Sequence, residues 1–214
     1  MEVLINWALT WLNFWLKWNM PLLDDLIEKL QWLPGIGKKT AQRLAFFLQK
    51  MEVSRVRELT DAILRARLEL KECSSCHNLG ETDPCAICSA PNRNREVICV
   101  VEQPADVMVV EKIGEYKGLY HILHGVISPI DNVGPENLRI KSLLERIKNQ
   151  KVSEVIIATN PTTEGDVTAL YIAKLLKPLN IKVTRIARGL PTGSDLGLAD
   201  GTTILRAFEG RSEL

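Results

Sequence analysis

Residues 155–173 read Val-Ile-Ile-Ala-Thr-Asn-Pro-Thr-Thr-Glu-Gly-Asp-Val-Thr-Ala-Leu-Tyr-Ile-Ala, and the hydrophobic period of this stretch changes in its middle. The first four residues are an apolar run with β-branched side chains, which is typical of a buried strand. In the second half the apolar residues recur at helical spacing, and the stripe comprises Ala169, Leu170, Ala173 and Leu176. The stretch therefore predicts a strand, a polar loop and a helix.

Similar apolar runs occur elsewhere in the second half of the chain, at residues 97–101, 119–123 and 181–186. Helical patterns lie between most of them, and one is formed by Ile140, Leu143, Leu144 and Ile147. Alternation of strands and helices is typical of a parallel sheet that is covered on both faces. We therefore predict an α/β fold with several parts. Cys99 lies inside one of the strand runs, and we expect it to be a core residue rather than a nucleophile.

The first half of the chain has the periodicity of helices. Apolar stripes predict three of them, over residues 22–30, 41–48 and 56–68, the last ending just before the first cysteine of the segment that follows. A tight turn, Pro34-Gly35-Ile36-Gly37, separates the first two helices. The sequence therefore predicts a helical hairpin with a glycine turn.

This hairpin has features that favour a phosphate ligand. Gly35 and Gly37 allow the backbone to approach a ligand closely, and the helix that follows directs its unpaired N–H groups toward the same place. Lys38, Lys39 and Arg43 add positive charge there, which suits sequence-independent contact with a nucleic-acid backbone. The alternative is a tight turn that binds nothing. No Walker-type phosphate loop is present in the sequence.

Four of the five cysteines form two Cys-x-x-Cys pairs that are separated by eight residues, and they are Cys73, Cys76, Cys85 and Cys88. Each pair can direct two thiolates at one ion, and four sulfur ligands in a tetrahedron suit zinc and leave no position open for water. We therefore predict one structural Zn²⁺ per chain. His77 is adjacent to Cys76, but four sulfurs already complete the coordination shell, so we do not expect it to be a ligand.

Acidic residues follow two of the predicted strands. Glu102 comes directly after residues 97–101, and Glu164 and Asp166 follow residues 155–158. In an open parallel sheet these positions face the crevice at the carboxyl edge. Carboxylates that cluster there can bind Mg²⁺ and direct phosphate chemistry. Alternatively, Glu164 and Asp166 are acids in the first turn of the next helix, where the helix dipole favours them.

The composition is that of a globular intracellular protein. The chain has 214 residues, 46% of them hydrophobic, and a formal net charge of only +1. A nucleic-acid partner must therefore be held by a local basic patch. Paired cysteines of this kind fit metal binding in a reducing compartment better than disulfides, so we expect a cytoplasmic protein.

Residues 1–19 are unusual because they are rich in tryptophan, with Trp7, Trp11, Trp15 and Trp18 among aliphatic residues. Polar residues recur every three or four positions, and the stretch is shorter than the roughly 20 apolar residues that a membrane helix needs. We therefore expect no membrane anchor. Two interpretations remain open, a start codon assigned upstream of Met20 and a packing or interfacial helix.

From about Met20 to the C-terminus the chain resembles the RecR family of bacterial recombination mediator proteins. The resemblance rests on the four cysteines and on five strings, LPGIGKKTAQRLAFFL (33–48), VICVVEQPADV (97–107), LHGVISPI (123–130), VIIATNPTTEGDVTALYIA (155–173) and GLPTGSDLGLADGTTILRAFEGR (189–211). It implies a helix-hairpin-helix region at 20–72, a zinc-finger module at 73–94, a Toprim domain at 95–189 and a C-terminal segment at 190–214. The Trp-rich N-terminal extension at 1–19 lies outside the usual family pattern.

The resemblance also implies a function. Members of the family are expected to bind DNA without sequence preference, through residues that match Gly35, Gly37, Lys38, Lys39 and Arg43 here. It further implies a homo-oligomer, a tetrameric ring that clamps DNA and works with RecO and RecF to load recombinase on gapped DNA. The Toprim crevice would then serve partner docking. Such a protein would act in the cytoplasm, at the nucleoid.

One departure from catalytic Toprim proteins bears on enzymatic activity. Catalytic members carry a D-x-D pair that binds Mg²⁺, and Asn160 and Thr162 stand at those positions here. This predicts a protein that is not an enzyme, with Glu102, Glu164 and Asp166 left as a weak metal or partner site. The alternatives are a magnesium-dependent nuclease or topoisomerase-like enzyme and a zinc module used only for protein contacts. Gly197 and Gly201 replace acids that the family resemblance leads us to expect in the C-terminal segment.

Overall fold

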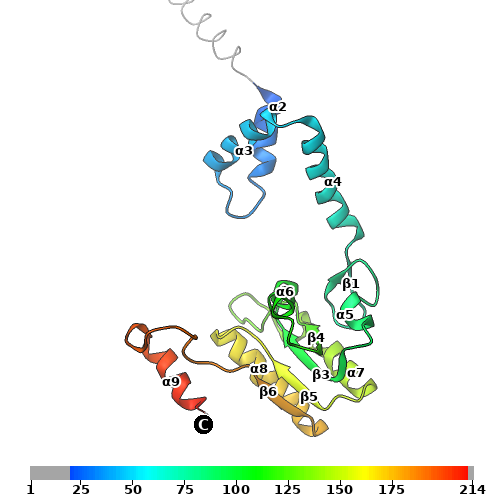
Figure 1. The fold of residues 1–214 in the computed structure, drawn as a ribbon, viewed down its shortest axis with the longest axis vertical. Coiled ribbons are helices and arrows are strands. Elements are labelled where there is room, and N and C mark those ends of the chain that lie inside the picture. Colours follow the sequence, from blue (N-terminus) through cyan, green and yellow to red (C-terminus); the bar gives the residue numbers. More distant parts are fainter. Residues whose placement is uncertain (1–19, 212–214) are drawn as a thin grey trace, which may run out of the picture. The chain divides into compact units, whose positions relative to one another are not determined.

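The computed structural model describes residues 20–211, so the interpretations of the tryptophan-rich segment 1–19 lie outside the described residues. The chain divides into two compact units between Arg67 and Leu68 (Figure 1). None of the described helices is long and apolar enough to cross a membrane. Each unit has its own core, and each is described by itself below.

The N-terminal unit is helical, as predicted. It contains α2 (Pro21–Leu30), α3 (Lys38–Lys50) and α4 (Val53–Glu69), and the last two residues of α4 are counted with the second unit. Pro21 occupies the first turn of α2, where its missing N–H costs nothing. A small core joins the first two helices, because Ile27 of α2 packs with Ala41 and Ala45 of α3. The small alanine side chains let the two helices of the hairpin approach closely.

The second unit contains the predicted parallel sheet. Its strands are β3 (Asn94–Val101), β4 (Gly118–Ile122), β5 (Glu154–Ile157) and β6 (Lys182–Arg185), in the order β4-β3-β5-β6. All three pairings are parallel, and Ile98 lies opposite both Leu119 and Val155. The four apolar runs of the sequence are therefore the four strands, and their carboxyl ends meet at one edge of the sheet.

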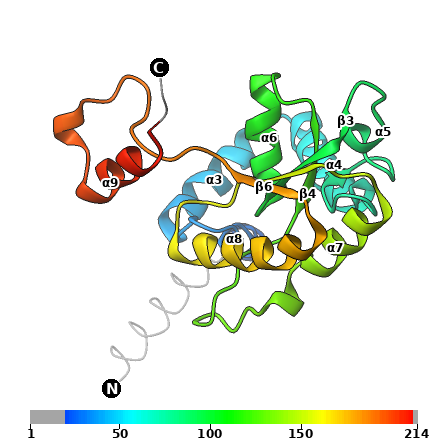
Figure 2. The same ribbon diagram turned by 90° about the horizontal axis from the view of Figure 1, so that it is seen from below.

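Helices cover both faces of the sheet. They are α6 (Pro104–Ile113), α7 (Ile140–Asn149) and α8 (Thr163–Leu176), and Figure 2 shows α6 on one face with α7 and α8 on the other. The buried side chains alternate accordingly. Ile98 and Val100 of β3 belong to the core that includes Leu143 of α7, whereas Cys99 and Val101 belong to the opposite core. Short 3-10 turns lie at Pro135–Asn137, Lys177–Leu179 and Leu196–Leu198.

The cysteine segment and the C-terminal segment complete the second unit. The cysteine segment has a two-stranded antiparallel ribbon, β1 (Lys71–Glu72) and β2 (Leu79–Gly80), and one short helix, α5 (Ala86–Ser89). The C-terminal segment contains α9 (Gly201–Glu209), which Asp200 caps by accepting a hydrogen bond from the Thr203 N–H at 3.0 Å. The sequence patterns predicted no helix in this segment.

Candidate zinc centre and nucleic-acid interface

The four cysteines meet at one buried point. The sulfur atoms of Cys73, Cys76, Cys85 and Cys88 all lie within 4.8 Å of one another. A tetrahedral zinc site with bonds of about 2.3 Å needs sulfurs about 3.8 Å apart, so the group has the size and the donor set for Zn²⁺. Among residues 20–211 it is the one group of three or more His, Cys, Asp or Glu residues that converges in this way.

Local hydrogen bonds shape this centre. The Cys85 N–H donates to the Cys73 sulfur at 3.3 Å, and the Cys73 N–H donates to the Asn78 carbonyl at 2.8 Å. A side chain at Gly80 would place its Cβ 2.9 Å from the Cys85 Cβ, so only glycine lets the β1-β2 ribbon approach the second cysteine pair. The two Cys-x-x-Cys turns are thereby held face to face by the backbone itself.

The thiol groups differ in acidity. The hydrogen bond with Cys76 lowers the pKa of the Cys88 thiol to about 5, with a further contribution from the charge of Arg146. The same contact raises the pKa of Cys76. A thiolate is the form that binds metal, so all four thiols give up their protons when the ion binds. Burial in β3 instead raises the pKa of Cys99 to about 12, which agrees with its predicted place in the core.

The zinc module packs against the sheet. The Ile122 N–H of the edge strand β4 donates to the Cys76 carbonyl at 2.9 Å, so the module covers part of the exposed edge of that strand. The His124 ring nitrogen donates to the His77 carbonyl at 2.8 Å. The His77 ring lies 2.6 Å from a carboxylate oxygen of Glu72 through its Nδ1, and it is not part of the converging sulfur group.

The hairpin turn of the N-terminal unit is open to solvent. Gly35 has φ of +80°, a conformation that side chains rarely adopt, and Gly37 precedes the first residue of α3. A Cβ at either glycine would meet no other atom within 4 Å. Among the residues that the structure describes, no side chain caps the α3 N-terminus, so its first N–H groups are available to an anion.

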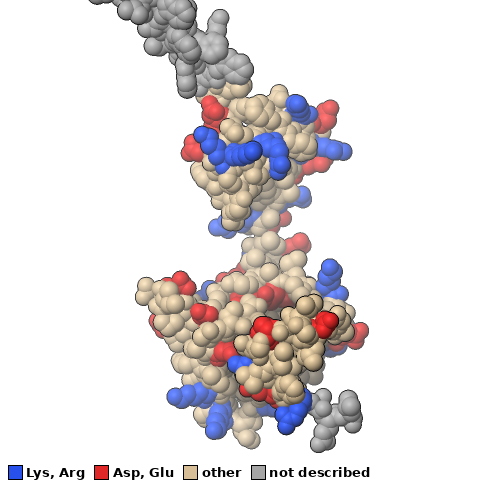
Figure 3. Space-filling model, turned by 90° about the vertical axis from the view of Figure 1, so that its left-hand side faces the viewer, with Lys and Arg blue, Asp and Glu red and all other residues tan. Residues whose placement is uncertain are grey.

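Positive charge surrounds this open turn. Lys38, Lys39 and Arg43 are exposed, and none of them forms an ion pair with another of the described residues. The first turn of α3 contains no acid, so the positive end of its dipole is not neutralised. Figure 3 shows Lys and Arg side chains on the visible face of the N-terminal unit. The predicted phosphate-binding residues are thus all exposed, in the turn and in the first half of α3.

At the carboxyl edge of the sheet, Glu102 is fully engaged by Asn160. Glu102 is 8% exposed, and one of its oxygens accepts from the Asn160 N–H at 2.7 Å while the other accepts from the Asn160 side-chain amide at 2.7 Å. Asn160 stands at the first position of the D-x-D pair. The amide groups of Asn160 therefore donate to the carboxylate of Glu102. An aspartate at position 160 would repel Glu102, and a metal ion would be required between the two acids.

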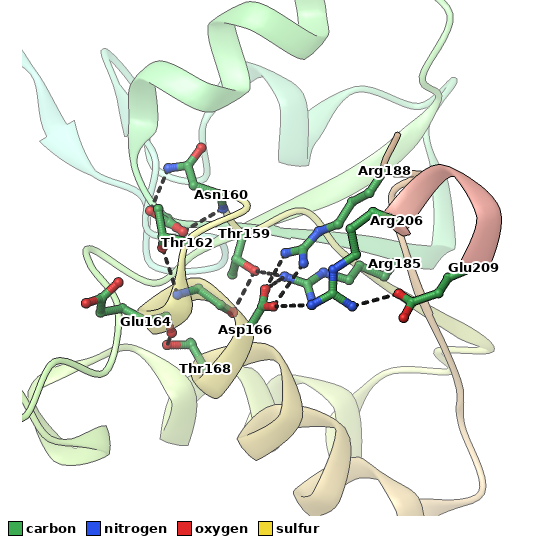
Figure 4. Close-up of polar contacts among 12 residues, drawn as sticks. Thr159, Asn160, Thr162, Glu164, Asp166, Thr168, Arg185, Arg188, Arg206 and Glu209 are labelled. Carbon is green, nitrogen blue, oxygen red and sulfur yellow. Dashed lines mark hydrogen bonds and ion pairs between the residues drawn. The ribbon is translucent and has the colours of Figure 1, made fainter. Parts of the chain in front are cut away.

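The second D-x-D position has a structural task. The Thr162 hydroxyl accepts from the Gly165 N–H at 3.0 Å and caps α8. Gly165 cannot bear a side chain, because its Cβ would lie 2.2 Å from the Asn160 carbonyl oxygen. The loop before α8 is therefore closed by its own backbone and by Thr162 (Figure 4).

Asp166 lies inside a cluster of arginines that sequence reasoning missed. Its carboxylate contacts Arg185 at 2.6 Å, Arg188 at 3.0 Å and Arg206 at 3.8 Å (Figure 4). These arginines come from β6, from the loop after it and from α9. No local sequence pattern predicts such a cluster, because its members are up to 40 positions apart in the sequence and only the fold brings them together.

The three acids therefore do not form a shared site. Glu102 is bound by Asn160, Asp166 by the arginines, and Glu164 is partly exposed at the start of α8. Beside Asp166, a cleft of about 790 Å³ lies between the start of α8, α9 and the chain after β6. Its polar lining includes Thr162, Asp166, Arg188, Thr203 and Arg206.

Comparison with protein families agrees with this geometry. A Toprim domain model matches residues 96–187, and three RecR models match residues 23–67 (helix-hairpin-helix), 70–90 (four-cysteine zinc finger domain) and 189–212 (C-terminal). Fold and site thus define a Toprim-domain protein that also carries a helix-hairpin-helix and a structural zinc finger. The chain belongs to the RecR family, whose domain architecture implies a role as a recombination mediator. Members of this family are generally not catalytic, although they contain a Toprim domain.

Proposed function

We propose that this protein is a non-enzymatic DNA-binding mediator of recombinational repair. In this role it forms a ring-like clamp and acts with RecO and RecF to help load recombinase on gapped DNA. The observation that carries the proposal is the open turn before α3, because uncapped N–H groups, two unobstructed glycines and three unpaired cations of the described residues lie there and in the first half of α3. The proposal extends to action in the cytoplasm, at the nucleoid.

The hairpin supports backbone recognition rather than sequence recognition. Main-chain N–H groups and lysines bind phosphate oxygens, which are the same at every nucleotide. Lys39 and Arg43 are four positions apart on α3 and therefore lie on the same side of the helix. A net charge of only +1 gives the whole molecule little attraction for DNA, so this local patch has to supply it.

The Toprim edge supports a non-enzymatic role. Metal-dependent phosphate chemistry needs carboxylates that converge on the ion. Here the backbone N–H and the side-chain amide of Asn160 each donate to one oxygen of Glu102, and Asp166 is neutralised by arginines. The cleft between α8 and α9 is instead suited to docking of a protein partner, as the family resemblance implies for RecO or RecF.

The test is binding of the full-length protein to gapped DNA over a series of salt concentrations, with and without Mg²⁺. We expect binding without strand cleavage, a logarithm of the association constant that falls linearly with the logarithm of salt concentration, and the same affinity in Mg²⁺ and in EDTA once ionic strength is matched. Native mass spectrometry of the same samples reports the number of subunits on the DNA.

The competing interpretation is a magnesium-dependent Toprim enzyme. Cleavage of the gapped DNA that requires Mg²⁺ and disappears in Glu102→Gln would overturn the proposal in favour of that enzyme. Absence of any DNA binding at low salt would overturn both and would leave the zinc module as a protein-contact device.

A further inference from the structure

Arg146 of α7 is buried against expectation. Only 7% of its surface is exposed, although it lies among residues of an amphipathic helix that packs Ile140, Leu143 and Ile147 into the core. A guanidinium group never loses its charge at physiological pH. Burying such a group costs several kcal/mol unless it is paired, so its surroundings should contain a matching negative charge.

The described residues supply no carboxylate for it. The Arg146 Nη1 donates to the Tyr120 carbonyl at 2.6 Å, and its Nε donates to the Gln150 side chain at 3.3 Å. Its Nη2 is buried and donates to no acceptor among residues 20–211. Both partners are neutral, so the positive charge is not compensated by these contacts.

The position of Arg146 points to the zinc module. In a strand, the carbonyl of one residue and the N–H of the second residue after it lie side by side on the same edge. At the outer edge of β4 the Tyr120 carbonyl accepts from Arg146, and the Ile122 N–H donates to the Cys76 carbonyl at 2.9 Å. Arg146 and the first cysteine pair are therefore neighbours on one strand edge.

The segment that holds the four zinc ligands, residues 73–88, has no lysine or arginine of its own. One Zn²⁺ bound by four thiolates carries two negative charges in excess. Residues 73–88 contain Glu81 and Asp83 but no Lys or Arg. Both acids add negative charge to this segment, and Asp83 accepts hydrogen bonds from the Ser74 N–H and hydroxyl. Positive charge for the centre must therefore come from outside residues 73–88.

We propose that Arg146 is the counter-charge of the zinc–thiolate centre and couples the zinc module to the Toprim domain. Zinc binding then compensates a charge that α7 has already buried, and the buried charge in turn stabilises the thiolates. Arg146 is thus a positioning residue for the metal centre, supplied by a helix that begins more than 50 residues after Cys88, the last of the four ligands.

The test is zinc affinity of the full-length protein, measured by competition with a chromogenic chelator. Arg146→Met keeps an unbranched side chain and removes the charge, and it should lower zinc affinity about tenfold or more, as loss of an outer-shell partner typically does. Arg146→Lys, which keeps the charge, should stay within about threefold of the wild-type protein. Arg95→Met is the matched control, because exposed Arg95 donates to the Cys88 carbonyl at 3.2 Å and solvent screens its charge.

Stability of the metal-free and zinc-bound forms separates this role from simple packing. Arg146→Met should lower the melting temperature of the zinc-bound protein but leave that of the metal-free protein unchanged or higher, because an uncompensated buried charge has gone. A variant that binds zinc as tightly as the wild-type protein, or that loses equal stability in both forms, would overturn the inference. Should Arg146→Met not fold, Arg146→Gln is measured in its place against the same two outcomes.

Discussion

Two helix N-termini in this protein have similar sequences and opposite designs. Both α3 and α8 are helices of more than ten residues that follow a loop with a proline. A glycine lies at the start of each helix, Gly37 directly before α3 and Gly165 in the first turn of α8. At α3 the first N–H groups have no side-chain cap, and space around Gly37 is open. At α8 the Thr162 hydroxyl caps the helix, and the Asn160 carbonyl fills the space beside Gly165.

The charges differ in the same way. Lys38 and Lys39 at the start of α3 have no acidic partner among the described residues, so they remain available to an external anion. Asp166 in the first turn of α8 is held by Arg185 and Arg188 from its own domain. The N-terminus of a helix that begins with a glycine turn is thus available to an external anion only where the protein itself leaves the N–H groups and the charges there without partners.

The largest difference should appear when each glycine receives a methyl group. Gly165→Ala should destabilise the second unit by about 3 kcal/mol, because the Asn160 backbone has to move. Gly37→Ala, whose Cβ enters open space at a permitted φ of −82°, should cost less than about 1 kcal/mol. Urea unfolding followed by circular dichroism measures both. Equal costs at the two sites would contradict the contrast between a closed and an open helix start.

The next largest effect concerns charge at the open site. Lys38→Ala combined with Lys39→Ala should weaken binding to gapped DNA roughly sixtyfold near 0.1 M salt and reduce the salt slope by about 2, because two phosphate contacts are lost. The control is Lys141→Ala with Lys148→Ala, which removes the same charge from the exposed side of α7. Unchanged binding in the hairpin variant would exclude the α3 turn from the interface.

The smallest effect should follow from restoring acids at the closed site. Asn160→Asp with Thr162→Asp recreates the D-x-D pair and places a carboxylate against Glu102, which should cost about 1 to 2 kcal/mol without metal. Mg²⁺ should recover at least half of this loss, and it should leave the wild-type melting temperature unchanged. Thermal melts with Mg²⁺ and with EDTA provide the comparison. If Mg²⁺ raised the melting temperature of the wild-type protein as much as that of the variant, the acids of the wild-type protein would bind the ion without the D-x-D pair.

Local sequence patterns predicted most of the architecture. The apolar runs at residues 97–101 and 155–158 are strands β3 and β5, and the cysteine spacing predicted a converging sulfur group. Helices α6 and α9 were not assigned individually. The hydrophobic residues of α9 include Leu205 and Phe208, and these two side chains are largely exposed among the described residues.

The edge of the Toprim sheet was predicted less well. The substitution of Asn160 for an acid was visible in the sequence, but its bond to Glu102 was not, because the two residues are 58 positions apart. The same holds for Asp166, for which the sequence suggested a metal or partner role. Its arginine partners lie 19 to 40 positions away along the chain.

The sequence by itself determined the features that depend on near neighbours. These are the helical hairpin with its glycine turn, the four zinc ligands and the loss of the D-x-D pair, since spacing over a few residues fixes which groups can face one point. Only the tertiary structure decided which charges are compensated. Arg146 meets the strand edge beside the zinc module, and Asp166 meets its arginines, through strand pairing and helix packing. Charged groups interact through space, and a local sequence pattern does not contain the distances between segments that the fold brings together.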